Sequence, residues 1–293
     1  MDTPKPQRVS IHGGHSGQFC NHARDTLEEI VEAYIARGFA WVGITEHMPP
    51  AHDDYLFPDE KEAGESAASL HDRFAAYIAA GRRLQERYRE RITIYLGMET
   101  EMYPGALELA ARIIAGLRPD YVVGSVHHVA GLAFDFSPEK YDAARRASGG
   151  WEAFYISYFD LQHQLIQKLQ PRVVGHFDLI RIYDPHYPIH LALPTVQTCI
   201  IRNLNLIKDQ GAILDLNLRA LAKGASEPYI SRPILKLARA MDIPVVPGDD
   251  SHGVASVGNH IETGIQILAD MGFDTRWAVP VALRSQGYRI SRQ

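Results

Sequence analysis

Cysteine is scarce in this sequence, which has only Cys20 and Cys199 among its 293 residues. Two cysteines cannot form the disulfide framework of a small secreted protein, so a reducing cytoplasm is the expected compartment. Long apolar segments are also missing. The sequence contains no run of about 18 apolar residues, and residues 1–10 contain no apolar stretch of signal-peptide length. We therefore expect neither a membrane-spanning nor a secreted protein.

Positive charge is not in excess either, since 30 Lys and Arg stand against 35 Asp and Glu, giving a net charge of -5. Proteins that bind nucleic acid use a basic surface, so this composition does not favour a nucleic-acid partner. With 46% hydrophobic and 22% charged residues, the chain has the composition of a globular protein. Its length suits one domain over residues 1–293, with residues 1–8 as a flexible tail. The sequence does not indicate an oligomeric state.

Short apolar segments alternate along the chain with segments of helical periodicity. The predicted strands are residues 9–12, 41–45, 92–98, 121–126, 173–175, 212–216 and 243–247. A first helix is expected from a cap at Asp25 to Gly38, and further helices at 69–90, 105–116, 151–169, 195–210, 232–241 and 257–271. Strict alternation of strand and helix favours a parallel sheet, and seven units indicate a closed or nearly closed α/β barrel.

Three connections between these elements are long. Residues 48–68 could form a lid, 129–150 read as a loose connection, and 178–193 are irregular and proline-rich. The last twenty residues carry no clear pattern.

Histidines and acids follow directly after several predicted strands. They are His12, His15, His47, Glu99, His127, His176, Asp250 and His252. The carboxyl ends of parallel strands meet at one mouth of a barrel, so these side chains should lie together. Unpaired buried polar groups would cost several kcal/mol each, and imidazole with carboxylate suits zinc, iron or manganese. The alternative is a hydrogen-bonded barrel mouth without metal. The remaining loop and helix histidines receive no role: His52, His71, His163, His186, His190 and His260.

Several segments resemble, in order, the motifs of the polymerase and histidinol phosphatase (PHP) family. They are the His12–His15 turn with Phe19–Ala23, then Gly43–His47, Gly124–His127, Gly175–Asp178 and Gly248–His252. Three others are most similar to the histidinol-phosphatases of that family: Ser16–Ala23, Gly97–Glu99 with Tyr103–Gly105, and Lys223–Gly224 with Glu227–Arg232. The resemblance spans residues 9 to about 270.

This resemblance implies a distorted (β/α)7 barrel with three divalent metal ions (zinc, iron or manganese) at its C-terminal mouth. The first ion would take His12 or its neighbourhood, His15, Glu99 and Asp250; the second Glu99, His127 and His176; the third His22, His47 and His252. Glu99 would bridge two ions, and Glu99, Asp250 and His252 would serve catalysis. The implied reaction is hydrolysis of a small phosphate monoester by a metal-bridging hydroxide, with L-histidinol phosphate giving L-histidinol in histidine biosynthesis.

Three cations are candidates for binding the phosphate dianion. Arg181 follows the His176 motif, Lys223 follows the strand that ends near Asn217, and Arg232 is a further candidate. The alternative for each is a solvated surface charge. Cys20 could be mistaken for a nucleophile, but a small buried residue is the expected role.

The sequence departs from the family pattern at two places. The first motif is usually His, one residue, His, whereas here Gly13 stands at the first position, after His12. Either the flexible glycines let His12 reach the first metal position, or that position has one ligand fewer. After Asn217, Leu218–Ala220 stand where Thr or Ser and then Gly are usual, so substrate contacts there can differ. These departures leave open three functions: histidinol-phosphatase, a PHP phosphoesterase acting on another small phosphate or a nucleotide, and a metal-loaded binding protein without catalysis.

Overall fold

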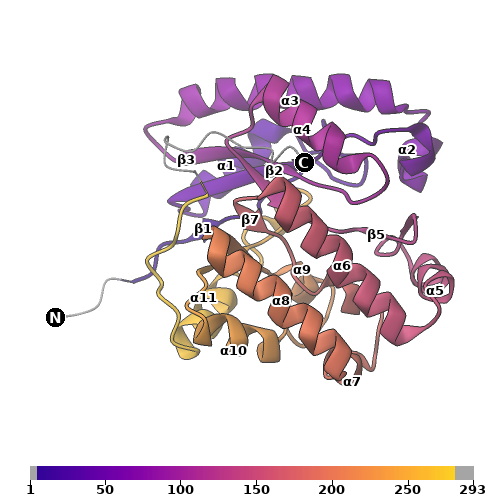
Figure 1. Ribbon diagram of the computed structural model, residues 1–293. Coiled ribbons are helices and arrows are strands. Elements are labelled where there is room, and N and C mark those ends of the chain that lie inside the picture. Colours follow the sequence, from indigo (N-terminus) through magenta and orange to yellow (C-terminus); the bar gives the residue numbers. More distant parts are fainter. Residues whose placement is uncertain (1–4, 281–293) are drawn as a thin grey trace.

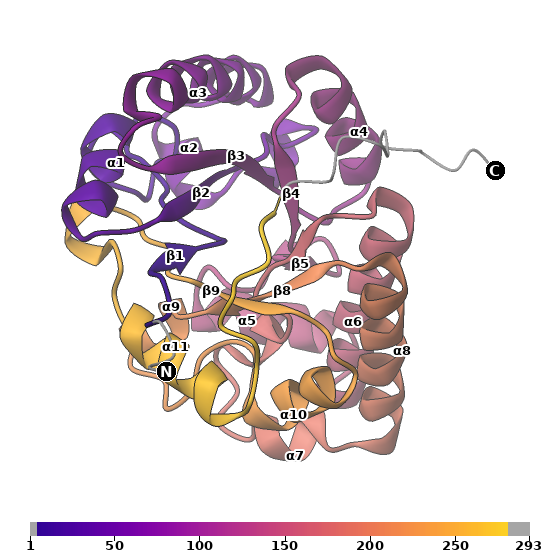
Figure 2. The same cartoon turned by 90° about the vertical axis from the view of Figure 1, so that its left-hand side faces the viewer.

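The computed structural model describes residues 5–280, and all seven predicted strands are present in it (Figures 1 and 2). They are β1 Val9–Ser10, β2 Trp41–His47, β3 Thr93–Glu99, β4 Tyr121–Gly124, β7 Val173–Val174, β8 Ile213–Asn217 and β9 Val245–Gly248. They form one sheet in the order β1-β2-β3-β4-β7-β8-β9, with every neighbouring pair parallel. This arrangement confirms the barrel predicted from the alternation of strands and helices.

The barrel closes at a seam between β1 and β9 that is not a regular ladder. The Ile11 amide donates to the Pro247 carbonyl at 3.0 Å, and the Asp250 amide donates to the His12 carbonyl at 2.8 Å. These hydrogen bonds lie at and just beyond the strand ends, so the first and last strands meet at the mouth that carries the polar residues. The barrel is therefore nearly closed, and its distortion lies beside that mouth.

Helices surround the strands on the outside of the barrel (Figure 2). The longer ones are α1 Leu27–Ala36, α3 Ala67–Tyr88, α4 Ala106–Leu117, α6 Trp151–Leu169, α8 Pro194–Gln210, α10 Arg232–Ala240 and α11 Ile261–Asp270. Among residues 5–280, no helix has both the length and the apolar character that crossing a bilayer requires. Each of these helices contributes buried apolar side chains to the larger hydrophobic core, which also contains side chains of the strands.

Two predicted helix starts are wrong by a few residues. Thr26, rather than Asp25, caps α1, and Glu29 completes its capping box. Asp25 has a left-handed backbone (φ 64°), and its carboxylate accepts the amide of Val254 at 2.8 Å instead. The last helix begins at Ile261 rather than residue 257, because His260 has φ 62° and interrupts the helical path.

The connections between the predicted strands and helices contain short elements that the periodicity did not predict. They are η1 Asp53–Tyr55, α2 Pro58–Glu62, the hairpin β5 His128–Val129 with β6 Leu132–Ala133, α5 Pro138–Ala147, η2 Leu179–Arg181, α7 Tyr187–Leu191, α9 Arg219–Ala222 and η3 Val254–Ser256. Helix α5 lies at the edge of the molecule in Figure 1 and buries only Tyr141 and Ala144, so its apolar pattern is too sparse to detect.

The predicted N-terminal tail, residues 1–8, lies partly outside the described residues. Residues 5–8 are exposed and without regular structure. Arg8 is nevertheless attached to the barrel, since its carbonyl accepts the Ala40 amide at 2.9 Å and its guanidinium pairs with Glu262 at 2.6 Å. The attached part of the chain therefore begins earlier than the sequence indicated.

A separate apolar cluster fills the amino-terminal half of the barrel interior. Its buried members are Val9, Ile11, Trp41, Tyr121, Val123, Val173, Ile213 and Val246. The Tyr121 hydroxyl crosses the interior and donates to the Ile11 carbonyl at 2.6 Å. A Cβ at Gly43 would lie 1.9 Å from that hydroxyl, so only glycine fits there. With this half filled, the polar side chains are confined to the opposite mouth.

Candidate metal centre

The polar residues that follow the strands converge at one mouth of the barrel and are buried there. His12, His15, Glu99, His127, His176 and Asp250 are each at most 7% exposed. The parallel register places His47 at the end of β2 beside Glu99 at the end of β3. The structure thus brings together the residues that the strand-end pattern predicted to lie together.

Glu99 lies at the centre of the cluster, and its two carboxylate oxygens face different imidazoles. Oε2 is 3.2 Å from His12 Nε2 and 3.3 Å from His47 Nδ1. Oε1 is 2.9 Å from His176 Nε2 and 3.4 Å from His127 Nε2. Burial opposes ionisation, but the imidazoles of His12 and His47 outweigh it and hold the pKa of Glu99 well below its usual range. An ionised carboxylate placed in this way can bridge two cations.

His12, the residue before the departure in the first motif, points into the cluster. Its side chain is fully buried, with Nδ1 2.9 Å from Asp215 Oδ2 and Nε2 directed at Glu99. Gly13 could not supply this ligand, because a Cβ there would lie 2.3 Å from the Gly43 carbonyl oxygen, against β2. The residue one position earlier therefore points into the cluster.

Asp250 joins the seam of the barrel to the cluster. Its Oδ1 is 3.4 Å from His15 Nε2, and its Oδ2 accepts a hydrogen bond from Asn217 Nδ2 at 3.1 Å. The same Asn217 amide donates to Asp215 at 3.1 Å. Burial would raise the pKa of Asp250, but the neighbouring His12 and His15 lower it well below its usual range.

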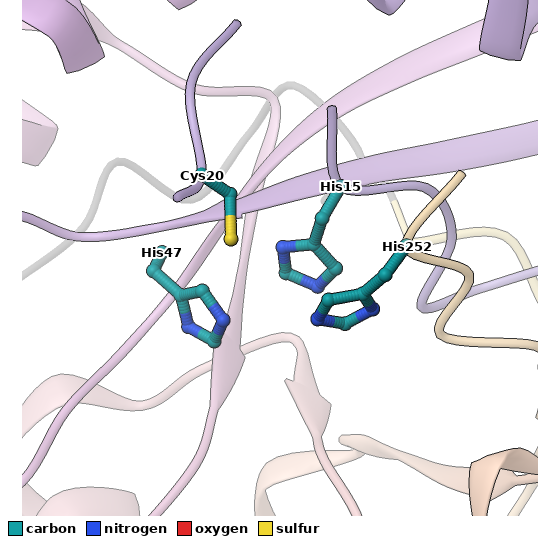
Figure 3. Close-up of side chains that lie close together, drawn as sticks. All are labelled: His15, Cys20, His47 and His252. Atoms are coloured by element: carbon teal, nitrogen blue, oxygen red, sulfur yellow. The ribbon is translucent and has the colours of Figure 1, made fainter. Parts of the chain in front are cut away.

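A further group of imidazoles lies on the outer side of the cluster. The rings of His22 and His252 are 5.0 Å apart between centroids, and those of His22 and His47 are 5.5 Å apart. Figure 3 shows Cys20 beside His15, His47 and His252. Burial raises the pKa of the Cys20 thiol well above its usual value.

Four acids behind the imidazoles were not predicted as site residues. Asp215 contacts His12, Glu46 Oε2 is 3.6 Å from His15 Nδ1, Glu101 Oε2 is 3.0 Å from His127 Nδ1, and Asp59 Oδ2 is 3.3 Å from His22 Nδ1. Carboxylates in this position orient imidazole ligands and raise their basicity. Glu101 could have been predicted from the sequence, because it follows Glu99 by two residues and side chains two apart in a strand point to the same side. Asp59 lies in the long connection, where no local pattern marks it.

Several buried nitrogen atoms of the cluster make no hydrogen bond. They include His12 Nε2, both ring nitrogens of His15, His47 Nδ1 and His176 Nδ1. Carboxylate oxygens lie 3.2–3.7 Å from His12 Nε2 and from the His15 nitrogens, but without hydrogen-bond geometry. Four groups of three or four His, Cys, Asp or Glu residues occur in the cluster. Within each group, the possible ligand atoms all lie within 4.8 Å of one another. Divalent ions would satisfy these atoms, so the residues fit the expected metals.

A cavity of about 220 Å³ opens onto the cluster, and two cations line it. Arg219 Nη1 lies 2.9 Å from the Asp250 carbonyl and 2.7 Å from His252 Nδ1. Lys223 is the second cation. A phosphate ligand has to line this cavity, so the position of Lys223 agrees with its prediction as one. Arg219 was not predicted, because it stands where the family pattern departs.

The other two predicted phosphate ligands do not line this cavity. The Arg181 guanidinium is buried, donates to Asp178 at 3.2 Å and to the Pro228 carbonyl at 2.5 Å, and lies 4.6 Å from the centre of the Tyr229 ring. Arg232 is exposed at the start of α10. The sequence did contain a sign of this ion pair, because Asp178 precedes Arg181 by three residues.

The cavity is also lined by aromatic and acidic side chains. Phe57 and Phe136, from two different connections, stack with their ring centroids 6.4 Å apart. Asp135 also lines the cavity, and its Oδ1 is buried without a hydrogen-bond partner. The cavity is therefore lined by cations and metal-type ligands, and also by two aromatic rings and a carboxylate with an unpaired oxygen.

Comparisons with family models, with curated relatives and with solved structures all point to the same family. Residues 13–219 match the model of the PHP domain. A Schizosaccharomyces pombe relative, named a probable histidinol-phosphatase, is 36% identical over 254 residues, which cover 85% of this chain and 82% of the relative. A crystal structure from Listeria monocytogenes, assigned as a histidinol phosphatase, has a TM-score of 0.75 at 25% identity and covers 87% of this chain and 99% of that one.

A second solved structure has the same fold. It is the histidinol phosphate phosphatase of Lactococcus lactis, determined in complex with zinc, L-histidinol and phosphate. Its TM-score is 0.66 at 17% identity, with 92% of this chain and 95% of that chain covered. Both solved structures therefore share the barrel described above.

Proposed function

Because the chain belongs to the PHP domain family, we propose that it is a metal-dependent phosphomonoesterase that hydrolyses L-histidinol phosphate to L-histidinol and phosphate. The observation that carries this proposal is the position of Glu99. Its two oxygens face separate groups of imidazoles at the base of a cavity that Arg219 and Lys223 also line. The name of the S. pombe relative supports the choice of substrate.

The metal ligands are proposed to divide into three sets. His12, His15, Glu99 and Asp250 would hold the first ion, Glu99, His127 and His176 the second, and His22, His47 and His252 the third. Divalent ions bound there supply Lewis acidity for the phosphate group and lower the pKa of water. The chain's own part is to hold these ligands in place, and Asp215, Glu46 and Glu101 do so from behind.

The cations of the cavity suit the phosphate end of the substrate. Arg219 and Lys223 can donate charge-assisted hydrogen bonds to phosphate oxygens, which are stronger than bonds between neutral groups. Arg219 is held in position by the Asp250 carbonyl, on the same segment as the metal-type ligands. A monoester bound against the cluster would therefore have its dianion between fixed positive groups.

Other side chains of the cavity suit the alcohol end of the substrate. L-histidinol carries an imidazole ring and an ammonium group, and aromatic rings and a carboxylate bind such groups by stacking, cation–π and ionic contacts. Phe57, Phe136 and Asp135 supply these contacts in the cavity. These side chains favour a cationic aromatic alcohol over a sugar or a second anion.

The test is phosphate release from a panel of monoesters. The protein is loaded in turn with zinc, manganese and iron(II), and its metal content is measured beside its kcat/KM for each ester. The proposal expects L-histidinol phosphate to exceed nucleoside monophosphates, sugar phosphates and p-nitrophenyl phosphate. Preference for another ester would indicate a different PHP phosphoesterase. Full metal content without hydrolysis of any ester would indicate a metal-loaded binding protein.

A further inference from the structure

We propose that Cys20 is a thiolate ligand of the third metal position, in addition to the imidazoles of His22, His47 and His252. Cys20 lies in the turn between β1 and α1, is 5% exposed, and has no disulfide partner. The resemblance to the PHP family gave this position three imidazoles and no sulfur. The proposal rests on the proposed function only in requiring that metal ions bind.

The geometry around the sulfur is that of a loosely arranged metal site. Ligand atoms of His15, Cys20, His47 and His252 all lie within 4.8 Å of one another. The sulfur is directed toward the imidazoles in Figure 3 and lies 3.3 Å from His22 Nε2. Ligand atoms around a tetrahedral zinc are about 3.4–3.8 Å apart, given Zn–N and Zn–S bonds of about 2.1 and 2.3 Å. Small side-chain rotations would therefore bring the sulfur and two imidazoles onto one ion.

A second observation points to a cation directly beside the sulfur, at the neighbouring first position. His15 is fully buried beside Cys20, and neither of its ring nitrogens makes a hydrogen bond. Its ring centroid is 4.5 Å from that of His47 and 4.3 Å from that of His252. An imidazole buried without a partner is costly unless a cation satisfies it. The sulfur thus lies among imidazoles that already indicate a cation, and it is not an isolated thiol in an apolar core.

The chemistry of the sulfur sets this position apart from the other two. When an ion binds, the thiol releases its proton to solvent and a sulfur–metal bond forms. A thiolate is a soft ligand that favours zinc, whereas carboxylate and imidazole also accept manganese and iron. The other two positions contain Glu99 and Asp250 and no sulfur. The third position should therefore keep zinc while manganese exchanges into the carboxylate-containing positions.

Cobalt substitution tests the proposal directly, because a thiolate bound to Co²⁺ gives an intense near-ultraviolet charge-transfer band. The full-length protein is stripped of metal and titrated with Co²⁺ as wild type, Cys20→Ser and Cys199→Ser. Cys199 is the other cysteine, buried in α8, and serves as the matched control. We expect the band in wild type and in Cys199→Ser and its loss in Cys20→Ser, with the visible bands of bound Co²⁺ present in all three proteins.

Two results would overturn the proposal: wild type that binds Co²⁺ without the band, or Cys20→Ser that retains it. If Cys20→Ser does not fold, zinc X-ray absorption on the wild type decides, because a sulfur neighbour at about 2.3 Å is required. Nitrogen and oxygen neighbours alone would reject Cys20 as a ligand. Neither measurement uses a phosphate ester, so failure of the proposed catalytic function would leave this result unaffected.

Discussion

His12 and Asp215 form a fully buried pair in which Nδ1 of the imidazole lies 2.9 Å from a carboxylate oxygen. In a neutral imidazole, a proton on Nδ1 would be donated to this carboxylate, and the lone pair of Nε2 would then be available to a cation beside Glu99. The two residues are 203 positions apart in the sequence and meet because β1 and β8 are close in the barrel. The pair therefore fixes the orientation of the imidazole that we propose as the first-motif ligand.

Asp215→Asn should weaken metal binding at the first position. An amide cannot hold the imidazole as a carboxylate does, and loss of such a partner reduces metal affinity by about 10–100-fold. The measurement is metal content after dialysis against buffered zinc, with the fold checked by circular dichroism. Asp209→Asn, on the exposed side of α8, is the control. Unchanged metal affinity in the folded Asp215 variant would mean that His12 needs no such support.

Gly13→Ala should destabilise the protein by about 1–3 kcal/mol, as expected for an added methyl group without space. Its Cβ would lie 2.3 Å from the Gly43 carbonyl oxygen and 2.8 Å from Val42. Gly116→Ala is the control, because its Cβ would meet no atom within 4 Å, and alanine is favoured in a helix by about 0.5–1 kcal/mol. Urea unfolding at fixed metal concentration measures both. Equal stability of the Gly13 variant and wild type would show that a side chain is tolerated there.

Glu99→Gln should lower activity by at least about 10²-fold, because the neutral amide cannot hold two cations. Metal should be lost mainly from the first and second positions, which have Glu99 as a ligand, and less from the third, where Glu99 is only a neighbour of His47. Steady-state phosphate release and metal analysis of the same sample test this. Glu108→Gln, at the exposed start of α4, controls for the loss of a charge. Wild-type turnover with full metal content would remove Glu99 from the site.

Arg219→Ala should mainly lower activity, whereas Arg181→Ala should mainly lower stability. Loss of Arg219 removes a charge-assisted bond to the phosphate, worth about 1.5–3 kcal/mol, and should lower kcat/KM about ten- to a hundredfold. Loss of Arg181 leaves the Asp178 charge buried and unpaired, and should cost about 3–5 kcal/mol of stability. Kinetics and urea unfolding of both variants separate the two effects. A change in kcat/KM confined to the Arg181 variant would restore Arg181 as the phosphate ligand.

The alkaline side of the pH–rate profile should depend on Lys223. Burial of its ammonium and the nearby Arg219 lower its pKa below the value for a free lysine. As pH rises, Lys223 therefore loses its charge earlier than an ordinary lysine, and phosphate binding weakens. Lys223→Arg keeps its charge, so the fall in kcat/KM should move to higher pH. Lys208→Arg, exposed on α8, should leave the profile unchanged, and an unshifted profile in both variants would exclude Lys223 from phosphate binding.

The sequence was sufficient to predict the barrel and most of its mouth. Each strand is an apolar run with a polar residue at its end, and parallel strands deliver their carboxyl ends to one side. Strand position alone therefore placed His47, Glu99 and His127 together. Helix α5 and the start of α11 were missed, because a sparse apolar face and a left-handed residue at His260 leave no periodic signal.

Tertiary structure decided which atoms face each other. Arg181 and Arg219 are both arginines just after strand-end motifs, yet a buried aspartate turns the first inward and the seam of the barrel holds the second at the cavity. Asp215 and Cys20 likewise gain their partners only when distant segments meet. Sequence spacing determines the end of the barrel at which a side chain emerges. Its direction there depends on packing and hydrogen bonds with residues far away in the chain.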